Sequence, residues 1–293
     1  MGKNVHKVSI IIPNYNRKRD LERLLPSISN QTFLDYEVII IDDFSPDRSV
    51  VEYISDFIRD SKKMRLVENT ENIGFVKTCN KGIKLSRGEY ICILTNDTDV
   101  TKNFVERNVE IMDADNTIGV LSCIIVDKEG NNWFSGGNLK GWFPVSLKDD
   151  FQGIRSVDYV AGTACFYRRE VFDRIGLLNE YFVMYHEDLE FSLRVKRRTS
   201  YRTCMFGEKL VKHYEGATGP ATRGVYYYGH RNLILLLKKY SPRSIPRMLL
   251  LHYLREIVNL LIISAIKRDV SNTIRTYDII RGTLNGLVEG YSE

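Results

Sequence analysis

Residues 37–43 read Glu-Val-Ile-Ile-Ile-Asp-Asp, a mainly β-branched run that ends in two carboxylates. A short apolar run of this kind is typical of a strand that is buried on both faces of a parallel sheet. Similar runs occur on either side, over residues 7–12, which end at Pro13, and over Tyr90–Leu94. Segments with helical spacing of apolar residues separate them. This alternation predicts an α/β fold with a mostly parallel central sheet and helices on both faces.

The remaining elements follow from the same two periodicities. We expect strands at 7–12, 37–41, 65–67, 90–94 and 120–126, and helices within 21–28, 50–58, 75–85 and 104–112. Residues 127–156 are expected to be irregular. Beyond them we expect β structure within 157–167, short helices at 169–175 and 189–197, and largely helical structure after about residue 224.

Polar side chains follow several of these strands at the point where each strand ends. The clusters are Pro13–Asn16, Asp42-Asp43, Asn69–Gly74 and Asn96–Asp99. Ligands of such sheets bind beyond the carboxyl ends of the strands, so the clusters predict one site. A further acidic cluster, Tyr185–Glu190, follows aromatic residues and opens a helix. Carboxylates that hold a metal on a leaving group, together with carboxylates that deprotonate a nucleophile, are typical of group-transfer enzymes.

Size, charge and glycine pattern limit the alternatives. The 293 residues suffice for one large domain, or for a domain of about 220–240 residues with an appendage. The formal charge of +5 is mild, and we expect no nucleic-acid partner. No GxGxxG follows the first strand and no GxxxxGK(S/T) occurs, which disfavours dinucleotide oxidoreductases and P-loop enzymes.

The cysteines and the N-terminus indicate the compartment. The five cysteines are far apart, odd in number and without a CxxC motif, so we expect free buried thiols in a reducing compartment. Residues 1–6 lack the apolar core and the cleavage site of a signal peptide. We therefore expect a cytoplasmic protein.

Six short motifs, by their order and spacing, resemble those of the family 2 glycosyltransferases of the GT-A fold, particularly the rhamnosyltransferase-like branch. They are Val8–Asn16, Val38–Asp43 with Ser45 and Asp47, Glu71–Phe75 with Asn80 and Gly82, Leu94–Asp99, Gly162-Thr163 and Tyr185–Glu190. The resemblance implies inverting transfer of a sugar from a nucleotide-diphosphate sugar to an acceptor hydroxyl. The acceptor would belong to a polysaccharide, a lipid-linked oligosaccharide or a glycoprotein glycan.

The resemblance also assigns residues to the nucleotide site. Pro13 and Tyr15 match the segment that flanks the base and the ribose. Asp43 matches the carboxylate that reads the pyrimidine ring nitrogen, with Asp42 as the second candidate. A half-buried aromatic residue at a strand end and a turn residue stay open as alternatives for Tyr15 and Asp42.

Four more residues match positions around the donor. Asn72, Asn80 and Asn96 belong to motifs near the donor sugar-nucleotide. Arg231, in a basic motif of the rhamnosyltransferase-like branch, is expected to clamp the diphosphate by paired hydrogen bonds. A surface position on a helix stays open as an alternative for Asn80 and for Arg231.

The metal would be Mg²⁺ or Mn²⁺, which prefer carboxylate and diphosphate oxygens. Asp97 matches the metal-binding aspartate of the family's DXD motif, with help from Asp99. The sequence departs from the motif at Thr95, where the family has the first aspartate. His213 matches a histidine that joins the metal shell in some relatives, and a structural role stays open for it.

The catalytic base implied by the resemblance is Asp188, which would take the proton from the acceptor hydroxyl. Glu187 and Glu190 flank it in sequence. Nearby like charges raise the pKa of a carboxylate and make it a better base, and we expect both glutamates to act in this way on Asp188.

The C-terminal part predicts an amphipathic helix. Within residues 248–266, polar residues recur at spacings of three and four, so they share one face of a helix that is otherwise apolar. We divide the chain into a catalytic domain, 1–240, and a C-terminal helical region, 241–293. Contact with an anionic membrane surface at the inner face of the cell membrane, or with a second copy of the chain, stays open.

Two other classes of protein remain as alternatives. A sugar-phosphate nucleotidyltransferase also combines strand-end carboxylates with a metal and a nucleotide, but its glycine- and lysine-rich N-terminal loop is missing here. A non-catalytic relative that only binds nucleotide-sugars is suggested by Thr95 alone.

Overall fold

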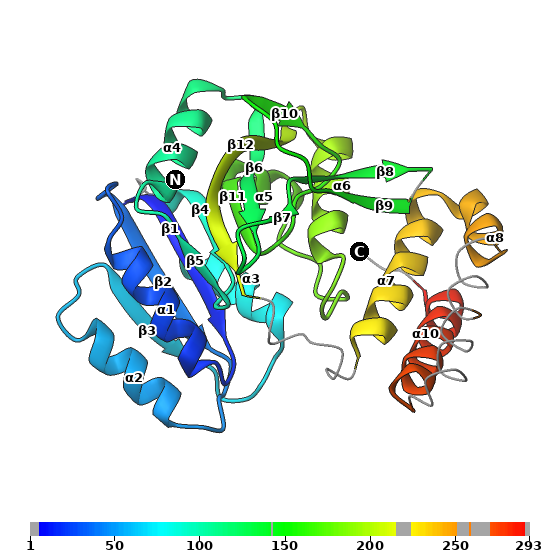
Figure 1. Ribbon diagram of the computed structural model, residues 1–293, viewed down its shortest axis with the longest axis horizontal. Helices are drawn as coiled ribbons and strands as arrows, with labels where there is room; N and C mark the ends of the chain where they lie inside the picture. Colours follow the sequence, from blue (N-terminus) through cyan, green and yellow to red (C-terminus); the bar gives the residue numbers. More distant parts are fainter. Residues whose placement is uncertain (1–5, 142, 215–223, 251–257, 259–269, 291–293) are drawn as a thin grey trace. The chain divides into compact units, whose positions relative to one another are not determined.

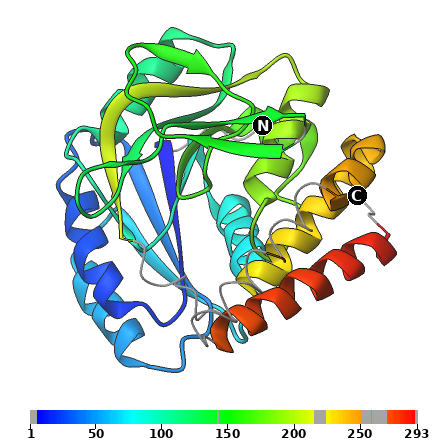
Figure 2. The ribbon, with the colours of Figure 1, turned by 45° about the vertical axis from the view of Figure 1, so that its right-hand side comes forward.

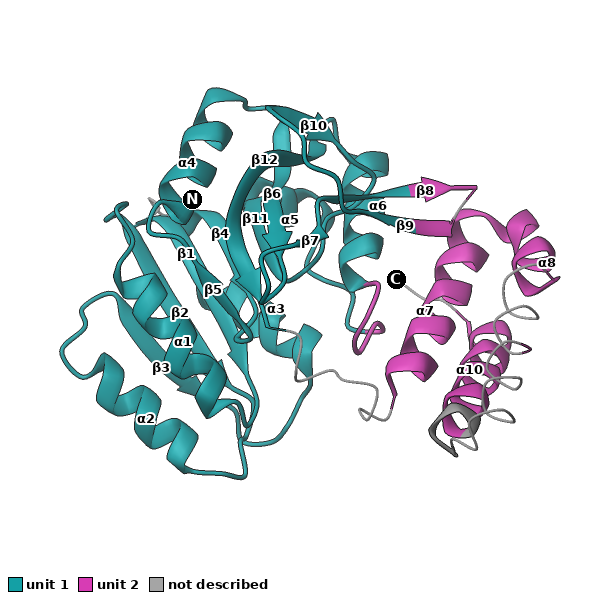
Figure 3. Ribbon diagram, in the orientation of Figure 1, with its two compact units in different colours: residues 1–138, 145–180, 187–216 teal, residues 139–144, 181–186, 217–293 magenta. Residues whose placement is uncertain are grey.

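The structure is a computed structural model that describes residues 6–141, 143–214, 224–250, 258 and 270–290. Contacts between residues group the chain into two units (Figure 3). Unit 1 comprises residues 1–138, 145–180 and 187–216, and unit 2 comprises residues 139–144, 181–186 and 217–293. The division into a catalytic domain over 1–240 and a helical region over 241–293 stays a prediction.

Four parallel strands form the first half of the sheet in unit 1. In chain order the elements are β1 (His6–Asn14), α1 (Lys18–Ser29), β2 (Tyr36–Asp42), α2 (Ser49–Ile58), β3 (Met64–Glu68), α3 (Phe75–Leu85) and β4 (Gly88–Leu94). The strand order is β3-β2-β1-β4, and every pair is parallel. Figures 1 and 2 show α1 and α2 on one face of these strands and α3 on the other. The predicted alternation and the helices on both faces are confirmed.

The second half of the sheet is mixed. Its main elements are β5 (Thr98–Val100), α4 (Phe104–Ala114), β6 (Ile118–Val126), β11 (Ala164–Arg168), α5 (Arg169–Ile175), α6 (Glu187–Arg198) and β12 (Arg202–His213). β11 lies between β4 and β6 and is antiparallel to both, whereas β12 is parallel to β6. Because Ala164 pairs with Leu94, the reversed β11 begins where β4 ends. The segment before β11 therefore reaches the edge at which the parallel strands end.

The prediction that residues 127–156 are irregular is wrong. They contain β7 (Asn132–Phe134), β8 (Gly136–Lys140), β9 (Phe143–Leu147) and β10 (Ile154–Ser156). β7 pairs with β6, β10 pairs with β12, and β8 pairs with β9. β7 and β10 have three residues each, which is too few to show a period of two, and the glycines of β8 and Pro144 of β9 disfavour strands in the sequence.

The twelve-residue strand β12 is absent from the sequence-based prediction. Its centre, Gly207-Glu208, interrupts the apolar pattern and forms a β-bulge, because Phe206 and Lys209 pair with consecutive residues of β6. A Cβ at Gly207 would lie 2.0 Å from the carbonyl oxygen of Phe151, so only glycine fits there. The bulge separates the first half of β12 from the half that ends at His213.

The core of unit 1 has the composition that its strands predict. All seven residues of β2 are buried, as expected of a strand with helices on both sides. α3 packs closely on β1 at Gly82, where a Cβ would lie 2.4 Å from Cγ2 of Ile11. All five cysteines are buried free thiols, which confirms that part of the prediction.

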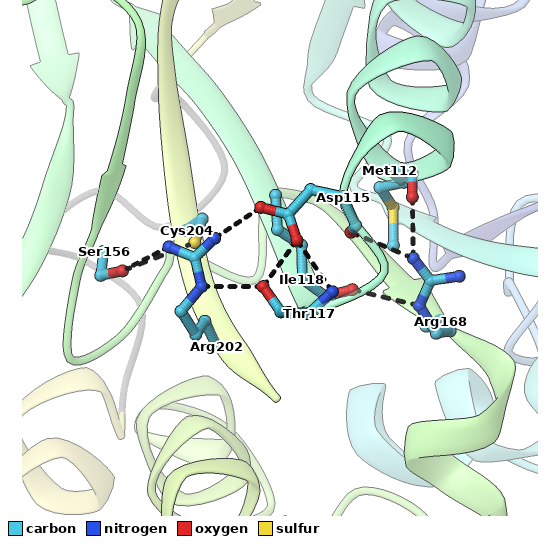
Figure 4. Close-up of polar contacts among 8 residues, drawn as sticks. All are labelled: Met112, Asp115, Thr117, Ile118, Ser156, Arg168, Arg202 and Cys204. Atoms are coloured by element: carbon cyan, nitrogen blue, oxygen red, sulfur yellow. Dashed lines mark hydrogen bonds and ion pairs between the residues drawn. The ribbon is translucent and has the colours of Figure 1, made fainter. Parts of the chain in front are cut away.

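Two arginines hold the turn between α4 and β6 (Figure 4). Arg168, at the end of β11, donates to the carbonyl oxygens of Met112 at 2.8 Å and Ile118 at 3.2 Å. Arg202, the first residue of β12, pairs with Asp115 at 2.6 Å. These contacts fix the starting points of β6 and β12, and the other end of β12, His213, contacts Asp97.

Unit 2 consists mainly of C-terminal helices. They are α7 (Val225–Tyr240), the 3₁₀ turn η1 (Pro242–Ser244), α8 (Ile245–Met248) and α10 (Val270–Val288). Their core contains Leu233, Ile234, Leu237, Met248 and Ile279. Glycines let α10 approach α7: a Cβ at Gly282 would lie 2.3 Å from the carbonyl oxygen of Tyr227. The predicted helical structure after residue 224 is confirmed for the described residues.

The predicted amphipathic helix over 248–266 lies outside the described residues, apart from 248–250 and 258. Among the helices that the structure describes, none has the length and apolar character needed to cross a membrane. Contact of this region with an anionic membrane surface or a second copy of the chain stays a prediction.

Candidate active site

A row of hydrogen-bonded side chains joins the carboxyl ends of β2, β1 and β4. Asn14, the last residue of β1, donates its Nδ2 to Oδ1 of Asp42 at 3.0 Å. The Oδ1 of Asn14 accepts a hydrogen bond from Asn96 Nδ2 at 2.8 Å. Asp42 is fully buried and also accepts hydrogen bonds from the backbone N–H and the hydroxyl of Ser45. Three of the predicted strand-end clusters are thus in direct contact.

Asp43 organises the loop that precedes α3. Its carboxylate accepts hydrogen bonds from Asn69 Nδ2 at 2.7 Å, from the Ile73 N–H at 2.9 Å and from the Gly74 N–H at 2.8 Å. Gly74 has a φ of 87°, which glycine adopts without a steric penalty. A carboxylate has about four acceptor positions, so Asp43 keeps about one for a nucleotide base.

Asp97 lies between Thr95 and His213. Thr95 Oγ1 donates to Oδ1 of Asp97 at 2.7 Å, and His213 Nε2 lies 3.3 Å from its Oδ2. The pairing of β5 with β12 creates this contact, because Thr98 is the partner of His213. Burial acts to raise the pKa of Asp97, but the hydrogen bond and charge of His213, together with the hydrogen bond from Thr95, outweigh it, so the pKa lies below 3.8.

The Asp97–His213 ion pair has a separation close to that of two adjacent ligands of a divalent cation. Adjacent ligands of an octahedral cation with bonds of about 2.1 Å lie about 3 Å apart, close to the 3.3 Å between Asp97 Oδ2 and His213 Nε2. His213 Nδ1 is buried without a hydrogen-bond partner. Trp133 on β7 packs on the imidazole, with ring centroids 4.5 Å apart. The separation of Asp97 and His213 therefore fits a cation, whereas His213 Nδ1 lacks the hydrogen bond that orients most metal-bound imidazoles.

Diphosphate oxygens and water would have to complete such a shell. In the part of the chain that the structure describes, no three His, Cys, Asp or Glu side chains are grouped as metal ligands. Mg²⁺ characteristically binds through one or two protein groups plus substrate phosphates. Asp99 is turned towards Tyr214, whose hydroxyl donates to its Oδ2 at 2.7 Å, and its role as a ligand stays a prediction.

Asp188 lies in the first turn of α6. Its Oδ2 accepts a hydrogen bond from the Gly162 N–H at 2.9 Å. Burial raises the pKa of Asp188 above its ordinary value of 3.8, although the N–H groups of Gly162 and Leu189 oppose this. Burial and the nearby Asp188 charge also raise the pKa of Glu187, whose Oε2 is buried without a partner. A raised pKa suits a general base.

Glu190 has a different environment from the one expected. It is fully buried and its Oε2 accepts a hydrogen bond from Arg194 Nε at 2.8 Å. Arg194 also donates to the carbonyl oxygens of Ile175 and Leu177. Glu190 is thus paired with Arg194, and burial, and not repulsion by Glu190, raises the pKa of Asp188.

A short series of bonds connects Asp188 with Asp97. Gly162 donates to Asp188, and the next residue, Thr163, accepts a hydrogen bond from the Thr95 N–H at 2.9 Å. Thr95 in turn donates its hydroxyl to Asp97. The antiparallel β11 makes this possible, because its preceding residues return to the end of β4. The expected base and the expected metal ligand thus belong to one edge of the sheet.

The other predicted nucleotide-site residues occupy two settings in unit 1. Pro13 is buried in β1, whereas Tyr15 beyond it is 46% exposed and Asn72 is exposed in the loop that Asp43 holds. Asn80 is buried, and its amide forms hydrogen bonds with the backbone of Leu178 and the carboxylate of Glu180. Asn80 therefore anchors the 178–180 segment, and its contact with a donor stays a prediction.

Arg231 belongs to unit 2 and has protein partners there. Its Nε donates to Glu289 Oε2 at 2.8 Å, and its guanidinium lies over the ring of Tyr181 at 4.6 Å. Contact with a diphosphate stays a prediction.

Some residues of the site were not selected from the sequence. Trp133 received no role there, and Asn14, Asn69 and Gly162 counted only as parts of clusters or motifs. A signal existed for Asn14, because it directly follows Pro13 at the end of β1. Trp133 had none, because its contact with His213 depends on the pairing of β7 with β6 and of β6 with β12.

Comparison with known proteins gives a family match. The family model described as glycosyl transferase family 2 matches residues 9–176. A protein of Bacillus subtilis named as the uncharacterized glycosyltransferase EpsJ is 29% identical over 220 residues, which are 71% of this chain and 61% of that protein. The amylovoran biosynthesis glycosyltransferase AmsB of Erwinia amylovora is 24% identical over 206 residues, 69% of this chain and 64% of that protein. The chain thus spans less than two thirds of the length of either relative.

Solved structures show the same fold. A crystal structure of GalNAc-T7 with UDP, GalNAc and Mn²⁺ has a TM-score of 0.66 and 17% identity, and it covers 81% of this chain and 48% of that one. Together with the mixed sheet and its helices, this similarity identifies the GT-A fold.

Proposed function

This chain belongs to glycosyl transferase family 2, and from that premise we propose that it is an inverting enzyme that transfers a sugar from a nucleoside-diphosphate sugar to an acceptor hydroxyl. The observation that carries the proposal is the bonded series from Asp188 through Gly162, Thr163 and Thr95 to Asp97. It supports the pairing of a base with a cation-binding carboxylate at one edge of the sheet.

In this proposal Asp188 removes the proton of the acceptor hydroxyl as its oxygen forms a bond to the anomeric carbon. The bond from that carbon to the diphosphate oxygen breaks from the opposite side, which inverts the configuration. A divalent cation held by Asp97 and His213 would neutralise the charge that develops on the departing diphosphate. The burial that raises the pKa of Asp188 makes it a stronger base.

We propose a pyrimidine nucleotide as the carrier of the sugar. Asp42 and Asp43 are buried at the strand ends, and Asp43 keeps an acceptor position for an imide N–H. The solved GT-A structure with UDP and Mn²⁺ supports this choice. The acceptor we propose is a growing polysaccharide or related glycan, in line with the relative named for amylovoran biosynthesis.

Release of nucleoside diphosphate tests the proposal. We expect one member of a panel of UDP- and dTDP-linked sugars, rhamnose included, to yield free UDP or dTDP and a new glycosidic bond when an acceptor glycan is present. The α/β configuration of the product, compared with that of the donor by NMR, checks the inversion. Retained configuration, or release of pyrophosphate from a nucleoside triphosphate plus sugar phosphate, would contradict the proposal.

Trp133 offers a direct measurement of the cation. The chain has two tryptophans, so the Trp142→Phe variant has Trp133 as its single tryptophan, which is excited selectively at wavelengths beyond the absorption of the tyrosines. Because the Trp133 ring lies 4.5 Å from His213, we expect Mn²⁺ with UDP to quench this fluorescence and Mg²⁺ to compete with the quenching. Mn²⁺ is paramagnetic and quenches tryptophan fluorescence at short range. Mg²⁺ is diamagnetic and does not quench it.

His213→Ala in the same Trp142→Phe background is the matched control. It removes the ligand but leaves Trp133 in place, so the quenching by Mn²⁺ should disappear. Equal quenching with and without His213 would show that Mn²⁺ binds elsewhere.

A further inference from the structure

The segment Tyr181–His186 precedes α6 and ends in an unusual backbone conformation. Tyr185 and His186 have φ values of 64° and 66°, the left-handed region that residues other than glycine rarely enter. Two such residues in succession persist only where the surroundings hold them. The next residue, Glu187, begins α6, and Asp188 follows it.

Asn232 on α7 holds this segment within unit 2. Its side chain is fully buried, and Nδ2 donates to the carbonyl oxygens of Met184 and Tyr185, both at 2.8 Å. The neighbouring Arg231 donates to Asn232 Oδ1 at 2.9 Å and to the carbonyl oxygen of Tyr181 at 3.3 Å. The Asn232 amide thus satisfies the carbonyl group before the left-handed pair and that of the first residue of the pair.

We propose that Asn232 is a positioning residue that fixes the left-handed Tyr185-His186 turn and thereby sets the orientation in which Asp188 enters α6. The inference rests on the proposed role of Asp188 as the base. Asn232 itself touches no reacting group in this proposal. It acts through the four consecutive residues from Tyr185 to Asp188.

The test is Asn232→Asp, which keeps the shape and the hydrogen bond from Arg231 but has no N–H to donate. We expect kcat for sugar transfer to fall about 10²-fold, as when a reacting group is misplaced by about 1 Å. The dissociation constant for UDP with Mn²⁺ should stay within about threefold of the unsubstituted protein. A role in general stability would not separate kcat from UDP binding in this way.

A second readout does not depend on activity. The Gly162 N–H donates to Asp188, so its amide resonance in protein labelled with ¹⁵N-glycine reports on the position of that carboxylate. Gly162→Ala identifies the resonance by its loss. We expect Asn232→Asp to shift the Gly162 resonance and to leave that of Gly88, at the start of β4, unchanged.

Ile234→Val is the matched control, because it removes a methyl group from the buried core of the same helix and none of the bonds to 184–185. It should lower the unfolding temperature without moving kcat or the Gly162 resonance. Asn232→Ala is the second variant. If Asn232→Asp does not fold, the Gly162 resonance and kcat of Asn232→Ala test the proposal instead. An unchanged Gly162 resonance in the folded variant would overturn the inference. If the unsubstituted protein transfers no sugar, the proposed function fails, and the resonance alone decides the role of Asn232.

Discussion

Asp188→Asn is expected to slow sugar transfer by about 10²–10⁴-fold, the usual loss when a positioned general base is removed. Asparagine has the same size and keeps an oxygen that can accept the hydrogen bond from Gly162, so the start of α6 should not change. The binding of UDP with Mn²⁺, measured by calorimetry, should stay within about threefold, because the base acts on the acceptor. A variant with more than about one third of the unsubstituted rate would remove Asp188 from the mechanism.

Asp173→Asn is the matched control, since Asp173 is an exposed residue of α5 and the chemical change is the same. It should leave transfer unchanged. The pH profile adds an independent check. A base must be deprotonated to act, so kcat/KM should fall as the pH drops through the pKa of Asp188, which burial holds above 3.8. This acid limb should be missing from the residual activity of Asp188→Asn.

Asp97→Ala is expected to weaken the binding of Mn²⁺ with UDP by at least about 10–100-fold, the loss seen even when residues behind metal ligands are replaced. The variant keeps His213 but lacks the carboxylate beside it. It also lacks the oxygen that accepts the hydrogen bond from the Thr95 hydroxyl. Calorimetry of UDP with Mn²⁺ and with EDTA measures the effect. In the unsubstituted protein EDTA should weaken UDP binding, and in the variant it should make little difference.

Asp173→Ala serves as the control for this substitution, and Asp99→Ala separates the two carboxylates of the cluster. Because Asp99 accepts its hydrogen bond from Tyr214, we expect a smaller loss of cation affinity than for Asp97. Unsubstituted protein that binds UDP equally well with Mn²⁺ and with EDTA would contradict the metal assignment.

The parallel half of the fold could be predicted because its strands are buried on both faces. β1, β2 and β4 each contain a short apolar run, and such runs are recognisable without tertiary information. β12 could not be predicted, because its bulge at Gly207-Glu208 places polar residues in the middle of the strand. The short strands of 132–156 are formed by pairing with β6 and β12 and with each other, and these pairings cannot be read from the local sequence.

The candidate site likewise contains residues that the sequence identifies and residues that only the structure identifies. Asp42, Asp97 and Asp188 stood out because each carboxylate follows or opens a regular element. Their partners were harder to find, because the contacts are made by residues distant in sequence. From the sequence, Thr95 only removes an anionic ligand from the DXD motif. In the structure its hydroxyl donates to Asp97 and orients that carboxylate. The left-handed turn at Tyr185 and His186 leaves no trace in composition, since neither residue is a glycine.

The β-bulge in β12 also bears on how this protein can evolve. Arg202 holds the start of the strand, and pairing with β6 is irregular between Phe206 and Lys209 and again between Lys209 and Val211, so the number of residues in this stretch affects which side chain faces Asp97. Loss of one residue there would bring Tyr214 to the position of His213, and gain of one would bring Lys212. A lysine would place a fixed positive charge beside Asp97 where the cation is proposed to bind. Descendants of this chain could therefore exchange a metal for an ammonium group by a change of length, without any substitution in the site itself.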